Sequence, residues 1–229
     1  MIKCIAFDMD DTLYDEIDYY KSGFQEVSRT IASDFGLNAL DVFDTLWTIF
    51  NGGNHNAAFD AAAKKFGIVF DDNYTAKLVD IFRNHKPDIA LPSDSRQVLT
   101  DLKKHYKLGL VTDGWLPAQE YKVKALGLDE FLDCIIYTEK LGAEHWKPSP
   151  KGFEILLSDV GVSASESIYV GDNLKKDFIA PNEMGFKTIW ISRKNKIHLE
   201  PAPSPQAVPQ FEIQSITELI DLLRKINAV

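Results

Sequence analysis

Short apolar runs alternate with amphipathic stretches along most of the chain. Runs this continuous in apolar residues are typical of strands covered on both faces, and the stretches between them repeat apolar residues with the helical period. The runs predict strands at Ile2–Phe7, Leu108–Val111, Cys134–Tyr137, Ser167–Val170, Lys187–Ile191 and Gln210–Ile213. Helices are expected at Ser93–His105, Pro117–Leu126, Pro150–Val160 and Leu174–Met184, with a last one opening at the capping-box pattern Ser215–Glu218. The alternation predicts an α/β fold with a parallel sheet.

One long segment, residues 15–91, departs from this alternation because it contains only helical patterns. The patterns predict four helices, at Ile17–Phe35, Leu40–Phe50, Asn56–Phe66 and Asn73–Asn84. The block lies between the first and second predicted strands. It therefore predicts an inserted all-helical domain over residues 15–91, with residues 1–14 and 92–229 forming the sheet domain.

Composition adds limits on size, partners and compartment. The 229 residues are 45% hydrophobic, enough for a packed core, and the formal net charge of -9 disfavours nucleic acid or an anionic membrane as partner. No apolar run approaches the length of a membrane span, and the first run ends at Asp8, too early for a secretory signal. Cys4 and Cys134 lie in apolar runs, which indicates two buried free thiols. We therefore expect a cytoplasmic protein.

Candidate chemistry begins at the end of the first strand, where Asp8, Asp10 and Asp11 fall within four positions. Residues at the carboxyl ends of parallel strands lie at the crevice where open α/β sheets bind ligands. Carboxylates held close together repel one another, so a cation is expected between them. An aspartate-rich turn would explain one or two of these acids without any site.

Further polar residues follow the other strands. They are Thr112, Asp113 and Gly114 after the second strand, Lys147 after the third, and Asp172, Asn173 and Asp177 after the fourth. Each group alone is explained by a turn, a surface lysine or a helix-capping acid. Their recurrence at successive strand ends indicates one composite site, because parallel strands bring their carboxyl ends to the same edge.

With these groups the chain resembles the haloacid dehalogenase (HAD) superfamily over nearly its whole length. The segment Asp8-Met-Asp10-Asp-Thr12 resembles the first family motif, Thr112 the second, Lys147 the third, and Gly171-Asp172 through Asp177 the fourth. The helical insert resembles the cap of subclass I. The resemblance implies a HAD-like Rossmannoid three-layer α/β/α core, with the first strand central and flanked by the second and fourth.

The resemblance also implies roles for the acids. Asp8 would be the nucleophile that forms an aspartyl-phosphate, and Asp10 would protonate the leaving group and then activate water. Magnesium would be held by Asp8, the backbone carbonyl of Asp10, and Asp172.

The remaining implied roles concern the phosphoryl group. Thr112 would bind its oxygens together with the amides of Asp113 and Gly114, and Lys147 would offset the local negative charge. Supporting positions implied by the same resemblance are Thr12, Asn173 and Asp177, the last orienting Lys147 or a bound water.

The implied function is a magnesium-dependent phosphatase acting on a small phosphomonoester, either a sugar phosphate or a nucleoside monophosphate. Three alternatives stay open. A phosphomutase usually carries glycine after the second acid, where this chain has Asp11 and Thr12. A dehalogenase has little use for an acid at Asp10 or for magnesium. A binding protein without catalysis would be expected to have lost a residue of the core set.

Substrate identity is the least determined feature. Candidate contacts are Tyr14, Glu16, Asn51, Asn54, His55 and Trp115, although a polar loop between helices explains those in the insert equally well. The sequence also leaves open the oligomeric state and the role of the proline-rich segment 201–209.

Overall fold

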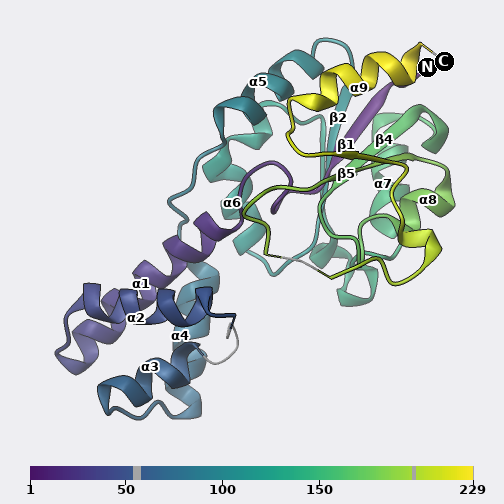
Figure 1. The fold of residues 1–229 in the computed structure, drawn as a ribbon. Helices are drawn as coiled ribbons and strands as arrows, with labels where there is room; N and C mark the ends of the chain where they lie inside the picture. The colour runs from purple at the N-terminus through teal and green to yellow at the C-terminus, as the bar shows by residue number, and fades with distance from the viewer. Residues whose placement is uncertain (54–57, 198–199, 229) are drawn as a thin grey trace. The chain divides into compact units, whose positions relative to one another are not determined.

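The computed structural model describes residues 1–53, 58–197 and 200–228. Within it the chain divides into two compact units (Figure 1). The first unit contains Met1–Ile17 and Ala90–Val229, and the second contains Asp18–Ile89.

A six-stranded parallel sheet forms the centre of the first unit, in the order β3-β2-β1-β4-β5-β6. The strands are β1 (Cys4–Phe7), β2 (Lys107–Thr112), β3 (Cys134–Tyr137), β4 (Ser167–Gly171), β5 (Lys187–Ile191) and β6 (Phe211–Ile213). Strand β1 is flanked by β2 and β4, as expected, and Phe7 pairs with Leu110 and Val170. This register brings the carboxyl ends of the three strands to one edge of the sheet.

Helices cover both faces of this sheet. They are α5 (Ser93–Leu102), α6 (Ala118–Leu126), α7 (Lys151–Val160), α8 (Ile179–Met184) and α9 (Glu218–Asn227). Helices α7 and α8 share a buried core with β1, in which Phe153 and Ala180 lie with Ala6. Helices α5 and α9 lie side by side on the opposite face (Figure 1). The three-layer α/β/α fold class predicted from the sequence is confirmed.

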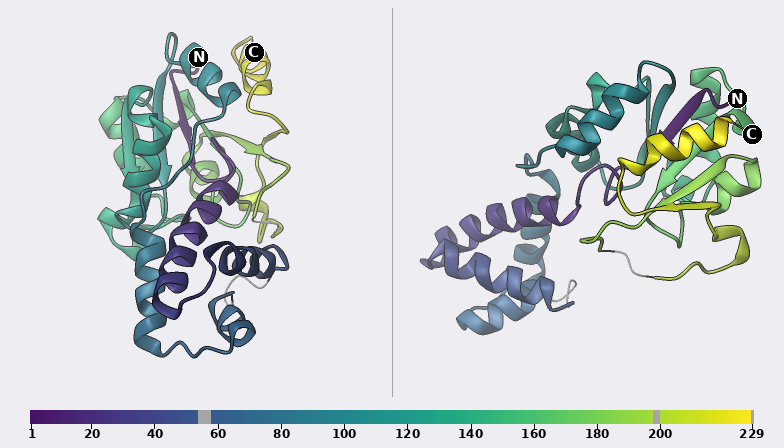
Figure 2. Two further views of the ribbon diagram at one scale, coloured as in Figure 1. Left: turned by 90° about the vertical axis from the view of Figure 1, so that its left-hand side faces the viewer. Right: turned by 45° about the horizontal axis from the view of Figure 1, so that its top comes forward.

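The two ends of the sheet unit lie close together (Figures 1 and 2). The backbone N–H of Ile2 donates to Oδ1 of Asn227 at 3.1 Å.

Of the two free cysteines, Cys4 is buried as expected, but Cys134 is only partly buried because its strand β3 is at the sheet edge.

Helix α8 begins later than the sequence pattern predicts. It covers Ile179–Met184, whereas the pattern places its start at Leu174. Turns occupy the preceding residues, because the Asn173 side chain accepts a hydrogen bond from the N–H of Lys175 and the Asp177 side chain accepts one from the N–H of Asn173. Such local bonds compete with helical hydrogen bonding, so the prediction was wrong over this segment.

Helix α5 is also shorter than predicted, ending at Leu102 instead of His105. The N–H of His105 bonds to the carbonyl of Leu102, three residues earlier, in a turn that leads the chain into β2 at Lys107.

The described residues of the second unit form four helices. They are α1 (Ile17–Phe35), α2 (Ala39–Asn51), α3 (Ala58–Phe66) and α4 (Asp72–Asn84), and the predicted start of the third helix at Asn56 lies outside the described residues. The Asn38 side chain caps α2 by accepting from two backbone N–H groups, and Asp71 caps α4 by accepting from the N–H of Tyr74. The core of the unit contains the buried side chains of Phe24, Val27, Ile31, Val42, Leu46 and Leu78. Among the described helices of the whole chain, none is long and apolar enough to cross a membrane.

Candidate active site

Asp8 lies directly after β1, where its N–H donates to the carbonyl of Val170 at 2.9 Å. Its Oδ1 atom lies 2.6 Å from Nζ of Lys147, which follows β3. The same ammonium lies 2.8 Å from Oδ1 of Asp177 and donates to the hydroxyl of Tyr169 at 3.1 Å. All of these side chains are buried, so one lysine provides the countercharge for two carboxylates that are largely shielded from solvent.

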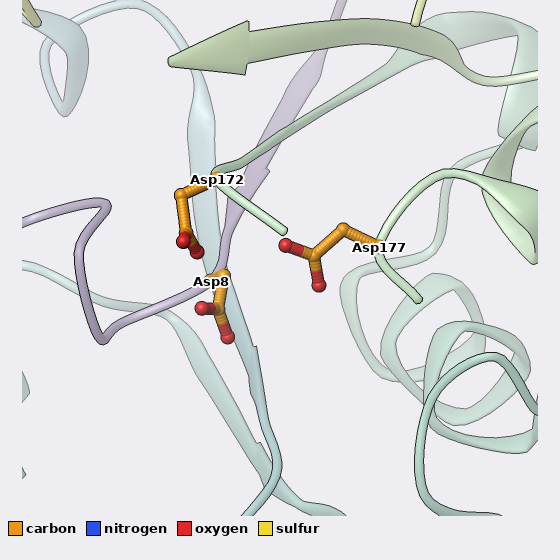
Figure 3. A group of neighbouring side chains, drawn as sticks. All are labelled: Asp8, Asp172 and Asp177. Atoms are coloured by element: carbon orange, nitrogen blue, oxygen red, sulfur yellow. The ribbon is translucent and has the colours of Figure 1, made fainter. Parts of the chain in front are cut away.

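Three buried carboxylates converge beside this lysine. Asp8, Asp172 and Asp177 each bring a carboxylate oxygen into a group whose atoms lie within 4.8 Å of one another (Figure 3). Burial and the neighbouring acids raise the pKa of Asp172 well above its ordinary value, and burial raises the pKa of Asp8 to about 7 although Lys147 opposes the shift. The Oδ2 atom of Asp172 is buried and has no hydrogen-bond partner among the described residues. An all-oxygen donor set with an unpartnered oxygen fits a Mg²⁺ ion.

The turn after β4 directs Asp177 into this group. The N–H of Asn173 donates to Oδ2 of Asp177 at 2.8 Å, which fixes the carboxylate opposite Lys147. A Cβ atom at Gly171 would lie 2.6 Å from the same oxygen. Only glycine therefore lets Asp177 lie this close to the end of the strand.

Asp10 has a different environment, although only Met9 separates it from Asp8 along the first loop. Its Oδ1 atom accepts hydrogen bonds from the hydroxyl of Tyr14 at 2.5 Å and from Nζ of Lys122 at 2.8 Å. Its Oδ2 atom accepts from Nζ of Lys122 at 2.9 Å and from Nε2 of Gln119 at 3.0 Å. Burial alone would raise the pKa of Asp10, but Lys122 and the bonds from Gln119 and Tyr14 outweigh it and lower that pKa.

The loop after β2 is connected to Asp10 through the same glutamine. The Nε2 atom of Gln119 also donates to Oγ1 of Thr112 at 2.9 Å and to the carbonyl of Asp113 at 2.5 Å. Gly114 adopts a φ of 137°, and a Cβ atom there would lie 2.9 Å from the Gln119 side chain. This loop therefore follows a path that requires glycine and places Thr112 beside Asp10.

The Asp113 carboxylate fixes this loop internally. It accepts hydrogen bonds from the hydroxyl of Thr138 at 2.8 Å, the N–H of Lys147 at 3.1 Å and Nζ of Lys176 at 2.9 Å. Burial opposes ionisation, but Lys147 and Lys176 lower the pKa of Asp113. Its side chain connects the loops after β2, β3 and β4.

Thr12 and Asp11 complete the first loop. Thr12 is fully buried, and its carbonyl accepts from Nε of Arg193 at 3.1 Å. Asp11 adopts a φ of 51°, and its carboxylate accepts from the N–H groups of Glu16 and Ile197. Burial raises the pKa of Asp11 to about 6. The two backbone bonds that its carboxylate accepts hold the loop in place.

Sequence reasoning missed four residues of this arrangement: Gln119, Lys122, Tyr169 and Lys176. Gln119 and Lys122 lie three positions apart on α6, and both side chains are buried. A charged residue and an amide on one helical face, directly after the Thr112 loop, is the signal that could have found them. The strand order brings the other two residues to the site. Tyr169 on β4 contacts Lys147, and Lys176 in the turn after β4 contacts Asp113.

The candidates for substrate contact fall into two groups. Tyr14 is fully buried and bonded to Asp10, and Glu16 lies 3.6 Å from Nζ of Lys122, so both belong to the Asp10 environment. Trp115 is half exposed and packs edge-to-face on Trp146, with ring centroids 5.8 Å apart. Asn51 is exposed at the end of α2, and Asn54 and His55 lie outside the described residues.

Comparison with known proteins identifies the family to which this chain belongs. A profile of the family described as haloacid dehalogenase-like hydrolase matches residues 5–191. The chain belongs to this family. All four strand-end groups of the site lie inside the matched range, and the resemblance drawn from the sequence is confirmed. The protein is a hydrolase of the HAD superfamily.

Curated relatives and solved structures agree with this membership. Glyceraldehyde 3-phosphate phosphatase of Methanopyrus kandleri is 30% identical over 233 residues, a match that covers 99% of each chain. Pyrimidine 5'-nucleotidase YjjG of Escherichia coli is 25% identical and covers 96% of this chain and 97% of its own. The solved structure of the HAD hydrolase YfnB from Bacillus subtilis, bound to magnesium, superposes with a TM-score of 0.67 at 22% identity, covering 97% of this chain and 98% of YfnB. The last match shows that the two HAD hydrolases share a fold.

Proposed function

We propose that this HAD hydrolase is a magnesium-dependent phosphatase that hydrolyses a small phosphomonoester through an aspartyl-phosphate on Asp8. The observation that carries the proposal is the contrast between two neighbouring carboxylates. Asp8 lies with Lys147 among buried acids, and Asp10 lies among hydrogen-bond donors. Two acids held in different environments suit two different roles in one reaction.

In the first step, an oxygen of Asp8 attacks phosphorus, and the bond from phosphorus to the ester oxygen breaks. The departing oxygen takes a proton from Asp10. In the second step, water attacks the phosphorus of the aspartyl-phosphate and gives a proton to Asp10, which releases inorganic phosphate and restores Asp8. Lys147 offsets the charge that gathers around Asp8 in both steps.

The phosphoryl oxygens would be bound by the loop after β2. The Thr112 hydroxyl accepts from Gln119, which leaves its own O–H available to donate to a phosphoryl oxygen. The backbone amides of Asp113 and Gly114 would add donors, and the bonds to the Asp113 carboxylate hold them in place.

The residues that would hold Mg²⁺ are Asp8 and Asp172 through their carboxylates and Asp10 through its backbone carbonyl. The contacts support this division, because both oxygens of the Asp10 carboxylate are bonded to Lys122, and both oxygens of the Asp177 carboxylate are paired, one with Lys147 and the other with Asn173. Bound Mg²⁺ would neutralise negative charge on the phosphoryl group next to Asp8.

The helical unit, Asp18–Ile89, is proposed to be the cap that determines which ester is hydrolysed. A sugar phosphate or a nucleoside monophosphate is the substrate class we propose, in line with the activities for which the two curated relatives are named. A panel containing glyceraldehyde 3-phosphate, hexose phosphates and pyrimidine nucleoside monophosphates would identify it. Asn51→Ala is expected to change the ratio of kcat/KM between substrates of the panel.

The decisive experiment substitutes the nucleophile. Asp8→Asn should abolish phosphate release while the thermal unfolding transition remains, and a chelator should silence the wild-type enzyme until Mg²⁺ is restored. Substantial turnover by Asp8→Asn would exclude the covalent mechanism. Release of inorganic phosphate without an isomeric phosphate ester would separate a phosphatase from a phosphomutase.

A further inference from the structure

Lys122 is a buried lysine that belongs to none of the four family motifs. It lies on α6, its side chain is 5% exposed, and its ammonium reaches both carboxylate oxygens of Asp10, at 2.8 Å and 2.9 Å. A side chain that bonds both oxygens of a carboxylate restricts its rotation as well as its position. A second carboxylate, that of Glu16, lies 3.6 Å from the same ammonium.

Gln119 restrains the same carboxylate from one helical turn away. Its side-chain amide lies 3.0 Å from Oδ2 of Asp10 and 2.9 Å from Oγ1 of Thr112. The amide therefore sets the distance between the group proposed to transfer protons and the group proposed to bind the phosphoryl oxygens. One face of α6 provides three of the four hydrogen bonds that Asp10 accepts, and Tyr14 provides the other.

We propose that Lys122, assisted by Gln119, is a positioning residue that orients the Asp10 carboxylate to take a proton from water when the aspartyl-phosphate is hydrolysed. The proposal rests on the proposed covalent mechanism. All four contacts come from donors, so they suit the ionised carboxylate, which is the form that accepts a proton in the second step. They hold the Asp10 carboxylate in one defined orientation.

With p-nitrophenyl phosphate as the substrate, hydrolysis of the aspartyl-phosphate can be measured separately from its formation. The leaving group of this substrate departs without needing a proton, so the first step depends little on Asp10, whereas hydrolysis of the aspartyl-phosphate still requires a base. In Lys122→Met we expect kcat to fall about 10- to 100-fold. KM should fall in parallel, so that kcat/KM stays within about threefold of the wild type.

The slow second step should also be visible directly. Rapid mixing of Lys122→Met with p-nitrophenyl phosphate should release a burst of p-nitrophenol equal to the enzyme concentration, and acid quenching should trap one phosphoryl group per enzyme, detected by intact mass. Lys122→Arg, whose guanidinium can also bond both oxygens, should recover much of the lost kcat. Lys124→Met removes an exposed lysine of the same helix and should leave all of these values unchanged.

A second substitution tests whether Lys122 acts through Asp10. In an Asp10→Asn background, Lys122→Met should lower kcat no further, because the group that it orients is already lost. Equal losses in kcat and kcat/KM without a burst, or the same fold-loss in the Asp10→Asn background, would overturn the proposal. If Lys122→Met does not fold, the same measurements can be made on Lys122→Gln, whose side-chain amide is a neutral hydrogen-bond donor.

Failure of the proposed function gives a different result. If Asp10→Asn, which lacks the base, accumulates no phosphoenzyme on acid quenching, the covalent mechanism is wrong whatever Lys122 does. If Asp10→Asn accumulates it and Lys122→Met does not, the mechanism stands and the role of Lys122 is wrong.

Discussion

The Nζ atom of Lys147 lies 2.6 Å from Oδ1 of Asp8, and neither side chain is more than 8% exposed. The pairing joins the loop after β3 to the end of β1, across the position of β2. Without the ammonium, Asp8, Asp172 and Asp177 would form a buried group of acids to which no other lysine of the described residues is bonded. Lys147 therefore has a structural role as well as its proposed catalytic one.

Lys147→Met should both inactivate and destabilise the protein. The loss of the countercharge should cost about 3 kcal/mol of unfolding free energy at pH 8, above the pKa of about 7 of Asp8, and less at pH 5, where Asp8 takes up a proton. Activity should fall at least about 100-fold. Urea unfolding at the two pH values checks the first expectation.

Lys151→Met is the matched control, because Lys151 pairs with Glu154 at an exposed position of α7. It should change stability by less than about 0.5 kcal/mol at either pH. An equal loss for the two lysine variants would mean that the burial of Lys147 has no energetic consequence.

Metal-free protein should lose stability as the pH rises from about 4 to about 8. Asp8 and Asp11 have pKa values raised from 3.8 to about 7 and about 6, and Glu16 from 4.5 to about 8. Between the ordinary and the raised pKa, the folded state holds protons that the unfolded state has released, so the free energy of unfolding decreases with pH. Asp10 and Asp113, whose pKa values are lowered, act in the opposite sense only below pH about 4.

Chemical denaturation across this pH range, with a chelator present, measures the effect. Asp8→Asn should reduce the decline, and saturating Mg²⁺ should oppose it, because a bound cation favours the ionised acids. A stability that rises between pH 5 and pH 7 in metal-free protein would contradict the assigned environments.

Gly171→Ala should displace Asp177. The added methyl carbon would lie 2.6 Å from Oδ2 of Asp177, a carboxylate held by the N–H of Asn173 and by Lys147, so it cannot move aside freely. We expect a loss of about 1–3 kcal/mol in unfolding free energy and a weaker response of the unfolding temperature to Mg²⁺.

Gly52→Ala is the comparison for this substitution. The glycine has an ordinary φ of -76°, and the nearest atom to an added Cβ is 3.3 Å away. It should keep the wild-type response to Mg²⁺. The same response in Gly171→Ala would show that Asp177 has room to move.

Arg193→Ala should destabilise the first loop. The guanidinium donates to the carbonyl of Thr12 at 3.1 Å, to Asp15 at 3.0 Å and to the hydroxyl of Ser95 at 3.0 Å. Three bonds from a side chain that is 13% exposed should be worth about 1–3 kcal/mol together. Urea unfolding monitors the loss, and Arg193→Lys should restore only part of it because an ammonium lacks the planar fork.

Arg224→Ala removes an arginine that also pairs with an aspartate, Asp221, but at a site where both side chains are about three-quarters exposed. Its expected cost is below about 0.5 kcal/mol. Comparable losses at Arg193 and Arg224 would rule out the three-bond network as a source of stability.

The strands were predictable because buried parallel strands are nearly continuous in apolar residues. The predicted bounds of β3 and β5 agree with the structure at both ends, and the same pattern located Asp8, Thr112 and Asp172 at strand ends. The central place of β1 followed from the family resemblance, and the register between Phe7, Leu110 and Val170 agrees with it.

Local polar bonds limited the prediction elsewhere. The hydrophobic period continues through Leu174, but the first turn of the expected helix is replaced by two side-chain hydrogen bonds. The N–H of Lys175 donates to the Asn173 side chain, and the N–H of Asn173 donates to the Asp177 side chain. A periodic pattern reports which side chains are apolar and contains no information about such competing bonds.

By itself, the sequence determined the strand–helix order, the four polar groups at strand ends and the family, because each of these is written in residues that lie close together along the chain. Only the tertiary structure decided which residue meets which across the site. Asp10 and Lys122 are 112 positions apart, and their contact depends on how α6 lies against the loop after β1. The environments that set Asp8 and Asp10 apart arise from burial and from partners on other elements, which no local pattern records.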